Sequence, residues 1–184
     1  MNRAGKLLVA HPNLRSSDFF YKTVIYIYAD DPKQGSLGLV LNKPTTTTLR
    51  DLCKRHGVLY PENITHINHG GPVSEQSIVM LHSDEWHSGN TTQAGMGYSL
   101  SSDQQMFERL SLGEYPAYWR MFFGICGWRP GQLQAELSGK PPYRPENSWL
   151  TAKANDHIMF MYDGEEQWTH AMELCKQQMI DFYF

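Results

Sequence analysis

Residues 22–42 hold the pattern that most constrains the fold. The segment "KTVIYIYAD" is β-branched and aromatic throughout, and the segment "LGLVLN" a few residues later is almost wholly apolar. Both compositions are typical of buried strands. Asp31, Pro32 and Gly35 lie between the two segments and are residues that favour turns. The sequence therefore predicts a β-hairpin here, with its two strands as antiparallel neighbours in a sheet.

The rest of the chain mixes further strands with single helices. Residues 117–126, "AYWRMFFGIC", are apolar on both faces and predict a central strand. Thr48 can cap a helix over residues 49–57. Further strands are predicted within residues 6–10, 64–68, 77–82, 97–101 and 156–162, and further helices within residues 102–114, 130–138 and 165–184. This order predicts an α+β fold, and the length of 184 residues suits one domain over residues 1–184.

Charge and composition bear on nucleic-acid binding. The 16 basic and 19 acidic residues give a formal net charge of -3, so the chain offers no general attraction for a phosphate backbone. The predicted helix at 49–57 carries Arg50, Lys54 and Arg55, but no second helix follows at the spacing of a helix-turn-helix. The sequence does not favour direct DNA binding, and a DNA-binding regulator stays as an alternative.

The cysteines and the N-terminus indicate a compartment. Cys53, Cys126 and Cys175 are odd in number, widely spaced and without a C-x-x-C pair, which is typical of a reducing cytosol. The apolar run near the N-terminus covers only residues 7–10, which is too short for a signal peptide or a membrane span. We expect a cytoplasmic protein with no membrane partner.

Three segments carry a resemblance to a known family. They are "DFFYKTVIYIYADDPKQGSLGLVLNKP" at 18–44, "HGGPVSEQSIVMLHS" at 69–83, and "GWRPGQLQAEL" at 127–137 with the later "NSWL" at 147–150. In content and order they resemble the YqgE/AlgH family of small, largely uncharacterised bacterial proteins. The chain departs from the family pattern at His11, at Cys126, where the family commonly has alanine, in a longer loop before Trp149, and in the C-terminal tail.

The resemblance implies a fold but no activity. The implied fold is a bent, mostly antiparallel β-sheet that closes into a pseudo-barrel with helices packed outside. The label of transcriptional regulator in this family comes from the phenotype of one member and not from a DNA-binding motif. The resemblance implies no cofactor.

Cys126 raises the question of catalysis. "GIC" followed by glycine resembles the nucleophile turn of glutamine amidotransferases, where helix amides lower the thiol pKa. Trp128 stands where that turn has its second glycine, and no histidine base is at a recognisable position. We therefore interpret Cys126, Gly127 and Trp128 as a structural corner at the end of the central strand, with the Trp128 ring packed near Leu133. A cysteine-dependent enzyme using Cys126 stays as a second alternative.

Two other groups of residues are candidates for binding. Asn42 and Lys43 end one strand and Gly70 and Gly71 follow another, so together they could form a corner that holds an anion. The histidines at 66 and 69 would face opposite sides of a strand, so we expect no metal site. The sequence as a whole favours a non-enzymatic regulatory or accessory protein that binds an unknown protein or small ligand, with no catalytic residue and no cofactor.

Overall fold

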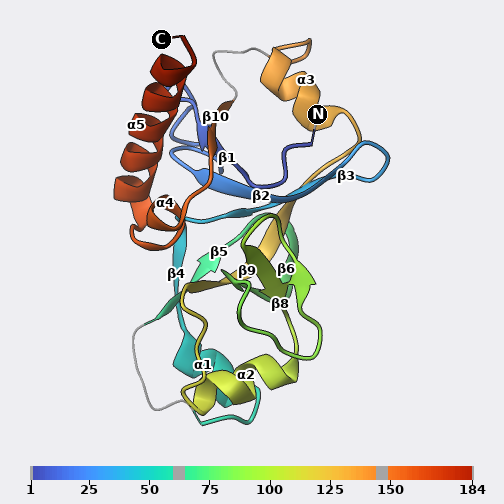
Figure 1. Cartoon of the computed structure of the whole chain (residues 1–184), viewed down its shortest axis with the longest axis vertical. Coiled ribbons are helices and arrows are strands. Elements are labelled where there is room, and N and C mark those ends of the chain that lie inside the picture. The colour runs from blue at the N-terminus through green and yellow to red at the C-terminus, as the bar shows by residue number, and fades with distance from the viewer. Residues whose placement is uncertain (1, 60–64, 144–148, 184) are drawn as a thin grey trace.

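The computed structural model describes residues 2–59, 65–143 and 149–183. Within them lie ten strands and five helices (Figure 1). The strands are β1 (Lys6–Ala10), β2 (Val24–Asp31), β3 (Gly35–Val40), β4 (Pro44–Thr48), β5 (His66–His69), β6 (Val73–Ser83), β7 (Thr92–Gln93), β8 (Tyr98–Ser101), β9 (Trp119–Trp128) and β10 (Trp149–Lys153). The helices are α1 (Leu49–Arg55), α2 (Gln104–Ser111), α3 (Gln132–Ser138), α4 (Asp156–Phe160) and α5 (Gly164–Tyr183).

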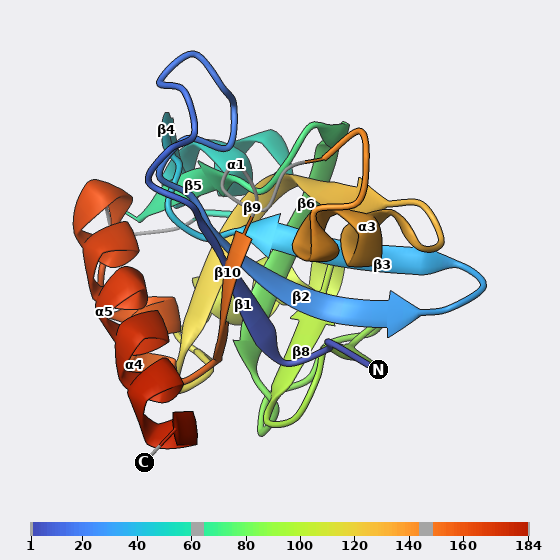
Figure 2. The ribbon, with the colours of Figure 1, turned by 90° about the horizontal axis from the view of Figure 1, so that it is seen from above.

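The strands form one curled sheet with the order β10-β1-β2-β3-β9-β6-β8-β7. Every neighbouring pair in that order is antiparallel, while β5 pairs parallel with β9 and antiparallel with β4. The helices lie outside the sheet: α3 and α5 at one end of the molecule, α1 and α2 at the other (Figure 1). Seen from above, α5 lies beside β10 and β1, and α3 lies next to β3 (Figure 2). The predicted α+β class with a bent, mostly antiparallel sheet is confirmed, and its curvature gives a half-barrel.

The hairpin at residues 22–42 forms as predicted. Strands β2 and β3 are antiparallel, with Ile25 opposite Val40 and Asp31 opposite Gly35. The Asp31 carboxylate accepts hydrogen bonds from the backbone N–H groups of Lys33 and Gln34 at 2.7 and 2.9 Å, which holds the turn. Gly35 has a φ of 98°, and a Cβ there would lie 2.0 Å from the Trp128 carbonyl oxygen. Glycine is therefore required where the hairpin crosses β9.

Strand β9 is central, as its apolar sequence predicts. It pairs with β3, β5 and β6. Its side chains enter all three buried clusters: Phe122 the cluster under α5, Met121 the cluster under α1 and α2, and Cys126 with Trp128 the cluster under α3. The strand thus joins the two ends of the molecule through one element.

Two predictions from the sequence are wrong, and one strand was missed. Residues 156–162 were expected as a strand, but residues 156–160 form α4, because the Asn155 side chain caps it by accepting from the Ile158 N–H at 2.9 Å. Strand β10 was not predicted from the sequence. The corner expected at 126–128 is displaced, because β9 continues through Trp128 with Gly127 opposite Leu37, and the chain turns at Pro130 and Gly131 instead.

Part of the predicted strand at 64–68 lies outside the described residues, and the strand observed there, β5, starts at His66. Among the described residues, no helix is both long enough and apolar enough to cross a membrane.

Candidate functional site

A cavity of about 300 Å³ opens beside α3, between the loop joining β1 to β2 and the end of β9. We call it the tryptophan pocket. Its lining residues come from six separate segments of the chain: Leu14, Asp18, Phe20, Pro72, Cys126, Gly127, Trp128, Gln132, Glu136, Tyr143 and Trp149. Residues of all three sequence segments that carry the family resemblance therefore meet at this one cavity.

The carboxylate of Glu136 organises the pocket. Its Oε2 accepts hydrogen bonds from the indole N–H groups of Trp128 and Trp149, at 3.1 and 2.9 Å. Its Oε1 accepts from the side-chain amide of Gln132, one helical turn earlier on α3, at 3.0 Å. The side-chain oxygen of Gln132, Oε1, in turn accepts from the backbone N–H of Arg129 at 3.1 Å. One carboxylate thus fixes α3 to the ends of β9 and β10, and hydrogen bonds to a charged acceptor are among the stronger ones.

Aromatic rings form the walls. Phe20 meets Trp149 edge to face, with ring centroids 5.4 Å apart, and Phe19 meets Phe20 in the same way at 4.9 Å. The loop that carries these two rings is shaped by Asp18, whose Oδ1 accepts from the Phe20 N–H at 2.8 Å. Trp128 is buried in one cluster with Leu133, while Trp149 is half-buried. The lining of the pocket therefore combines buried residues of β9 with partly exposed aromatic rings from the loop and from β10.

Cys126 lies at the floor of the pocket, with 1% of its surface exposed. Its thiol donates to the Gly70 carbonyl at 3.4 Å. Burial raises the pKa of this thiol to about 12, and the positive charge of Lys43 offsets that only in part. A thiol with this pKa is protonated at neutral pH, which deprives it of the charge that a nucleophile needs.

The four residues expected at a binding corner are brought together. The His69 N–H donates to the Lys43 carbonyl at 2.7 Å, and the Val40 N–H donates to the Gly70 carbonyl at 2.8 Å. Asn42 is buried, and its side-chain amide is hydrogen-bonded to the backbone. Its Oδ1 accepts from the Val24 N–H, and its Nδ2 donates to the carbonyls of Lys22 and Gly164, each at 2.8 Å. The amide therefore links three segments of the chain and has little hydrogen-bonding capacity left for a ligand.

The two glycines of this group allow backbone to approach backbone. A Cβ on Gly70 would lie 2.4 Å from the Gly124 carbonyl oxygen, and a Cβ on Gly71 would lie 2.3 Å from the Ile125 carbonyl. The Lys43 ammonium donates to the Phe19 carbonyl and lies 3.9 Å from the centre of its ring. Burial lowers the pKa of Lys43, against the opposing charge of Asp18. Lys43 therefore contacts Phe19, whose ring packs against Phe20 of the pocket lining.

His66, His69 and His82 differ in their burial and in their partners. His66 is exposed, while the Nε2 of His69 lies 3.3 Å from a Glu75 carboxylate oxygen. His82 is fully buried, with Nδ1 against the Ser83 carbonyl and Nε2 against the Ser101 hydroxyl, both at 2.9 Å. In the described part of the chain, no group of three or more histidine, cysteine, aspartate or glutamate side chains is placed to hold a metal ion.

Sequence reasoning did not single out Glu136, and it treated Asp18, Phe20 and Trp149 only as parts of the family segments. Glu136 looks like an ordinary polar residue on an amphipathic helix, and its partners lie 8 and 13 residues away. The available signal was the family resemblance itself, because all three segments that carry it contribute residues to the pocket. Their convergence became visible only in the fold.

The fold and the pocket define a class: a small α+β protein whose curled antiparallel sheet carries an aromatic pocket at the end of its central strand. The chain belongs to the AlgH-like family, whose model matches residues 7–180. Among its relatives, a UPF0301 protein of Nitrosospira multiformis is 34% identical over 172 residues, which cover 91% of this chain and 87% of the relative. A UPF0301 protein of Mannheimia succiniciproducens is 33% identical over 184 residues, covering 95% and 92%.

Solved structures agree with this assignment. The solution structure of the AlgH protein from Pseudomonas aeruginosa matches with a TM-score of 0.76 and 28% identity, covering 95% of this chain and 89% of that one. A crystal structure of a protein from Corynebacterium diphtheriae matches with a TM-score of 0.69, covering 92% and 85%. At 22% identity the second match shows the shared fold alone. The names of these proteins state no activity.

Proposed function

We propose that this protein is a non-enzymatic binding protein, and that it acts in a regulatory or accessory role through a small ligand or a protein segment held in the tryptophan pocket. The observation that carries the proposal is the convergence of the three family-like segments on this cavity. Each segment is far from the others in sequence, and each contributes side chains to the lining. A packing gap between two elements would be lined by two segments of the chain, whereas this cavity is lined by six.

The size and build of the pocket support this proposal. At about 300 Å³ it falls at the lower end of the range for small-molecule sites, and it combines aromatic walls with few polar groups, as such sites do. Its Glu136 carboxylate is held by three donors, so little ordering is required when a ligand arrives. A pocket of this volume suits a metabolite or one side chain of a partner.

The chemistry of Cys126 supports the non-enzymatic part. The thiol is buried, its pKa is raised to about 12, and its hydrogen-bond partner is a backbone carbonyl, which cannot remove a proton. These features oppose the activation that a cysteine nucleophile requires. The three cysteines are free and buried, which also supports our proposal of a cytoplasmic location.

The proposal can be tested by blocking the pocket. Gln132 lines it, whereas Gln134 lies two residues along the same helix, is exposed and is not part of its lining. We would immobilise the parent, Gln132→Trp and Gln134→Trp proteins, equilibrate each with a bacterial metabolite extract, and identify the retained small molecules by mass spectrometry. A binding protein should retain the same molecules on the parent and on Gln134→Trp and lose them on Gln132→Trp.

Equal retention by all three proteins would place binding elsewhere, and retention by none would remove the small-ligand form of the proposal. Circular dichroism of both variants shows whether α3 is still folded, so that a loss on Gln132→Trp reports the pocket and not unfolding.

A further inference from the structure

The tryptophan pocket has a charge that its lining does not neutralise. Two carboxylates, Asp18 and Glu136, belong to the lining, and no described lining residue carries a positive charge. Lys43 lies near enough to Asp18 to interact with it electrostatically, but its ammonium donates to the Phe19 carbonyl and is not part of the lining. The pocket therefore has a net negative charge when both acids are ionised.

Each carboxylate keeps acceptor capacity. Glu136 accepts three hydrogen bonds, two on Oε2 and one on Oε1, whereas a carboxylate has about four lone-pair sites. In Asp18, Oδ1 accepts from the Phe20 N–H, and no described residue donates to Oδ2. A ligand that donates hydrogen bonds and carries positive charge would complete both groups.

The aromatic residues of the lining favour the same class of ligand, which is one that carries positive charge. Phe20, Tyr143, Trp128 and Trp149 are aromatic, and together they bring several rings around one small cavity. Aromatic faces attract organic cations, and sites for quaternary and alkylated ammonium groups are commonly built from such rings. An inorganic cation gains little from these walls and would need more oxygen ligands than the lining supplies.

We propose that the tryptophan pocket binds an organic cation, namely an alkylguanidinium or alkylammonium group, with its apolar part among the aromatic rings and its N–H groups directed at Glu136 and Asp18. The inference rests on the proposed function, because it names the chemical class that the same pocket takes. A basic metabolite and a basic side chain of a partner protein share this chemistry.

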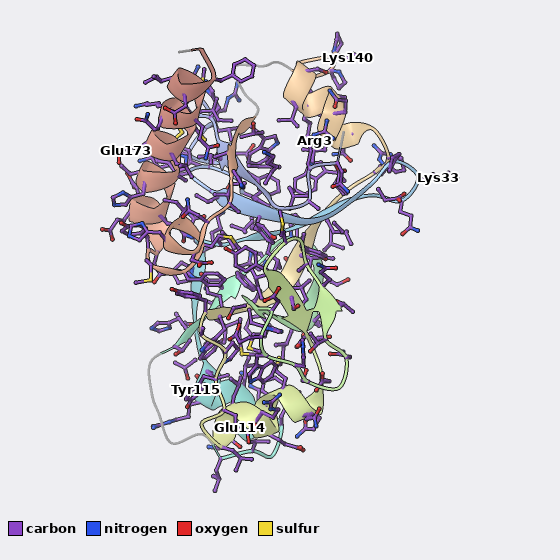
Figure 3. All side chains as sticks on the ribbon, viewed as in Figure 1. Arg3, Lys33, Glu114, Tyr115, Lys140 and Glu173 are labelled. Carbon is purple, nitrogen blue, oxygen red and sulfur yellow. The ribbon has the colours of Figure 1, made fainter. Side chains whose placement is uncertain are left out.

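The test uses ¹⁵N-labelled protein and four probes with the same four-carbon chain: butylguanidinium, butylammonium, butanol and butyrate. The indole N–H signals of Trp128 and Trp149 report the pocket, since both donate to Glu136. The indole of Trp86 donates to the Glu114 carbonyl and serves as an internal control. Glu114 lies at the opposite end of the molecule from Lys140, which follows α3 (Figure 3). The two cations should shift the Trp128 and Trp149 signals saturably, and at least about tenfold more tightly than butanol or butyrate.

Variants assign the preference to the two acids. Glu136→Gln should weaken butylguanidinium binding about tenfold, the cost of losing a charged hydrogen-bond acceptor. Asp18→Asn should weaken it less, because Lys43 already offsets that charge, and it keeps an acceptor for the Phe20 N–H. Glu108→Gln, an exposed acid on α2, should change nothing. If Glu136→Gln does not fold, Asp18→Asn decides, since Asp18 is on an exposed loop.

The outcomes separate this inference from the proposed function. If butanol or butyrate shifts the two indoles as strongly as the cations do, the pocket binds without regard to charge; the cation inference is then refuted and the proposed function stands. If no probe moves the indoles, the cation inference fails whatever the metabolite experiment shows. The peptide acetyl-Gly-Arg-Gly-amide distinguishes the source, because binding tighter than butylguanidinium supports a partner's side chain and exclusion of the peptide supports a small metabolite.

Discussion

Replacing Trp128 by alanine should destabilise the protein more than any other single change at the pocket. The Trp128 ring is 6% exposed and lies in one buried cluster with Cys126 and Leu133. Its indole N–H is also one of the two that fix Glu136. The substitution therefore removes a large buried ring and one of the bonds that hold α3 against β9.

The magnitude follows from these two losses. Truncating a buried tryptophan costs about 3–5 kcal/mol, which is a large share of the roughly 5–15 kcal/mol that holds a typical domain folded. Glu136 keeps its other two donors, so it is not left unpaired, and we expect a total of about 4 kcal/mol. In a chain of this length 1 kcal/mol lowers the melting temperature by about 2–4 °C, so Trp128→Ala should melt about 8–16 °C below the parent.

Urea denaturation followed by circular dichroism, together with a thermal melt, measures this effect. Trp128→Phe keeps most of the ring and should fall between the parent and Trp128→Ala. Trp149→Ala removes the other indole hydrogen bond to Glu136, but from a half-buried ring, and should cost less. If Trp128→Ala is as stable as the parent, the buried ring and its bond to Glu136 do not hold α3 against β9.

The remaining predictions concern the thiol, a buried histidine and DNA. Because burial raises the pKa of Cys126 to about 12, iodoacetamide at neutral pH should leave it unlabelled in the native protein and label it after unfolding; rapid native labelling, seen by peptide mass spectrometry, would contradict this. Burial lowers the pKa of His82 below its ordinary value of 6.5, so the unfolded chain binds the proton more tightly. Stability should be complete above about pH 6.5 and fall as the pH drops from there through the folded pKa, with a flatter profile for His82→Gln; equal slopes for the two proteins would exclude His82 as the cause. With a net charge of -3, any duplex DNA affinity should disappear at about 0.15 M salt, and sequence-selective binding in a gel-shift assay at that salt would revive the DNA-binding alternative.

Local sequence determines the parts of the fold that could be predicted. The β2–β3 hairpin follows from two apolar runs and the turn residues Asp31, Pro32 and Gly35 between them. Helix α1 follows from a capping box, in which the Thr48 hydroxyl accepts from the Asp51 N–H and the Thr48 N–H donates to the Asp51 carboxylate. In both cases the deciding contacts lie within a few residues, so the pattern is visible in the chain itself.

The elements that were missed or misassigned depend on distant partners or on a cap that was overlooked. Strand β10 has a short and partly polar sequence, and it is a strand because it pairs with β1, where Ala10 is opposite Trp149. Helix α4 is only five residues long, and its apolar run resembles a strand until the Asn155 cap is noticed. Short segments of this kind take the structure that their tertiary contacts impose.

The sequence indicated which segments contribute to the candidate site, but it did not indicate that they meet at one cavity. The family-like segments contain Asp18, Phe20, Trp128 and Trp149, but nothing in their spacing shows that they surround one cavity. Glu136 could not have been identified, because its importance comes from two indole groups that only the fold brings to it. Asn42 was singled out as part of a corner that could hold an anion, and in the structure its side-chain amide is hydrogen-bonded to backbone groups of Val24, Lys22 and Gly164.

Whether the tryptophan pocket is the binding site of the molecule can be seen by soaking crystals of the protein with fragments. Crystals of the parent protein would be soaked with a chemically diverse fragment set, and the electron density would be searched over the whole surface. Bound fragments should gather between Phe20, Trp128 and Trp149, and basic fragments should be over-represented among them. Crystals of Gln132→Trp should lose this site alone. Fragments that gather elsewhere while this pocket stays empty would contradict the proposal.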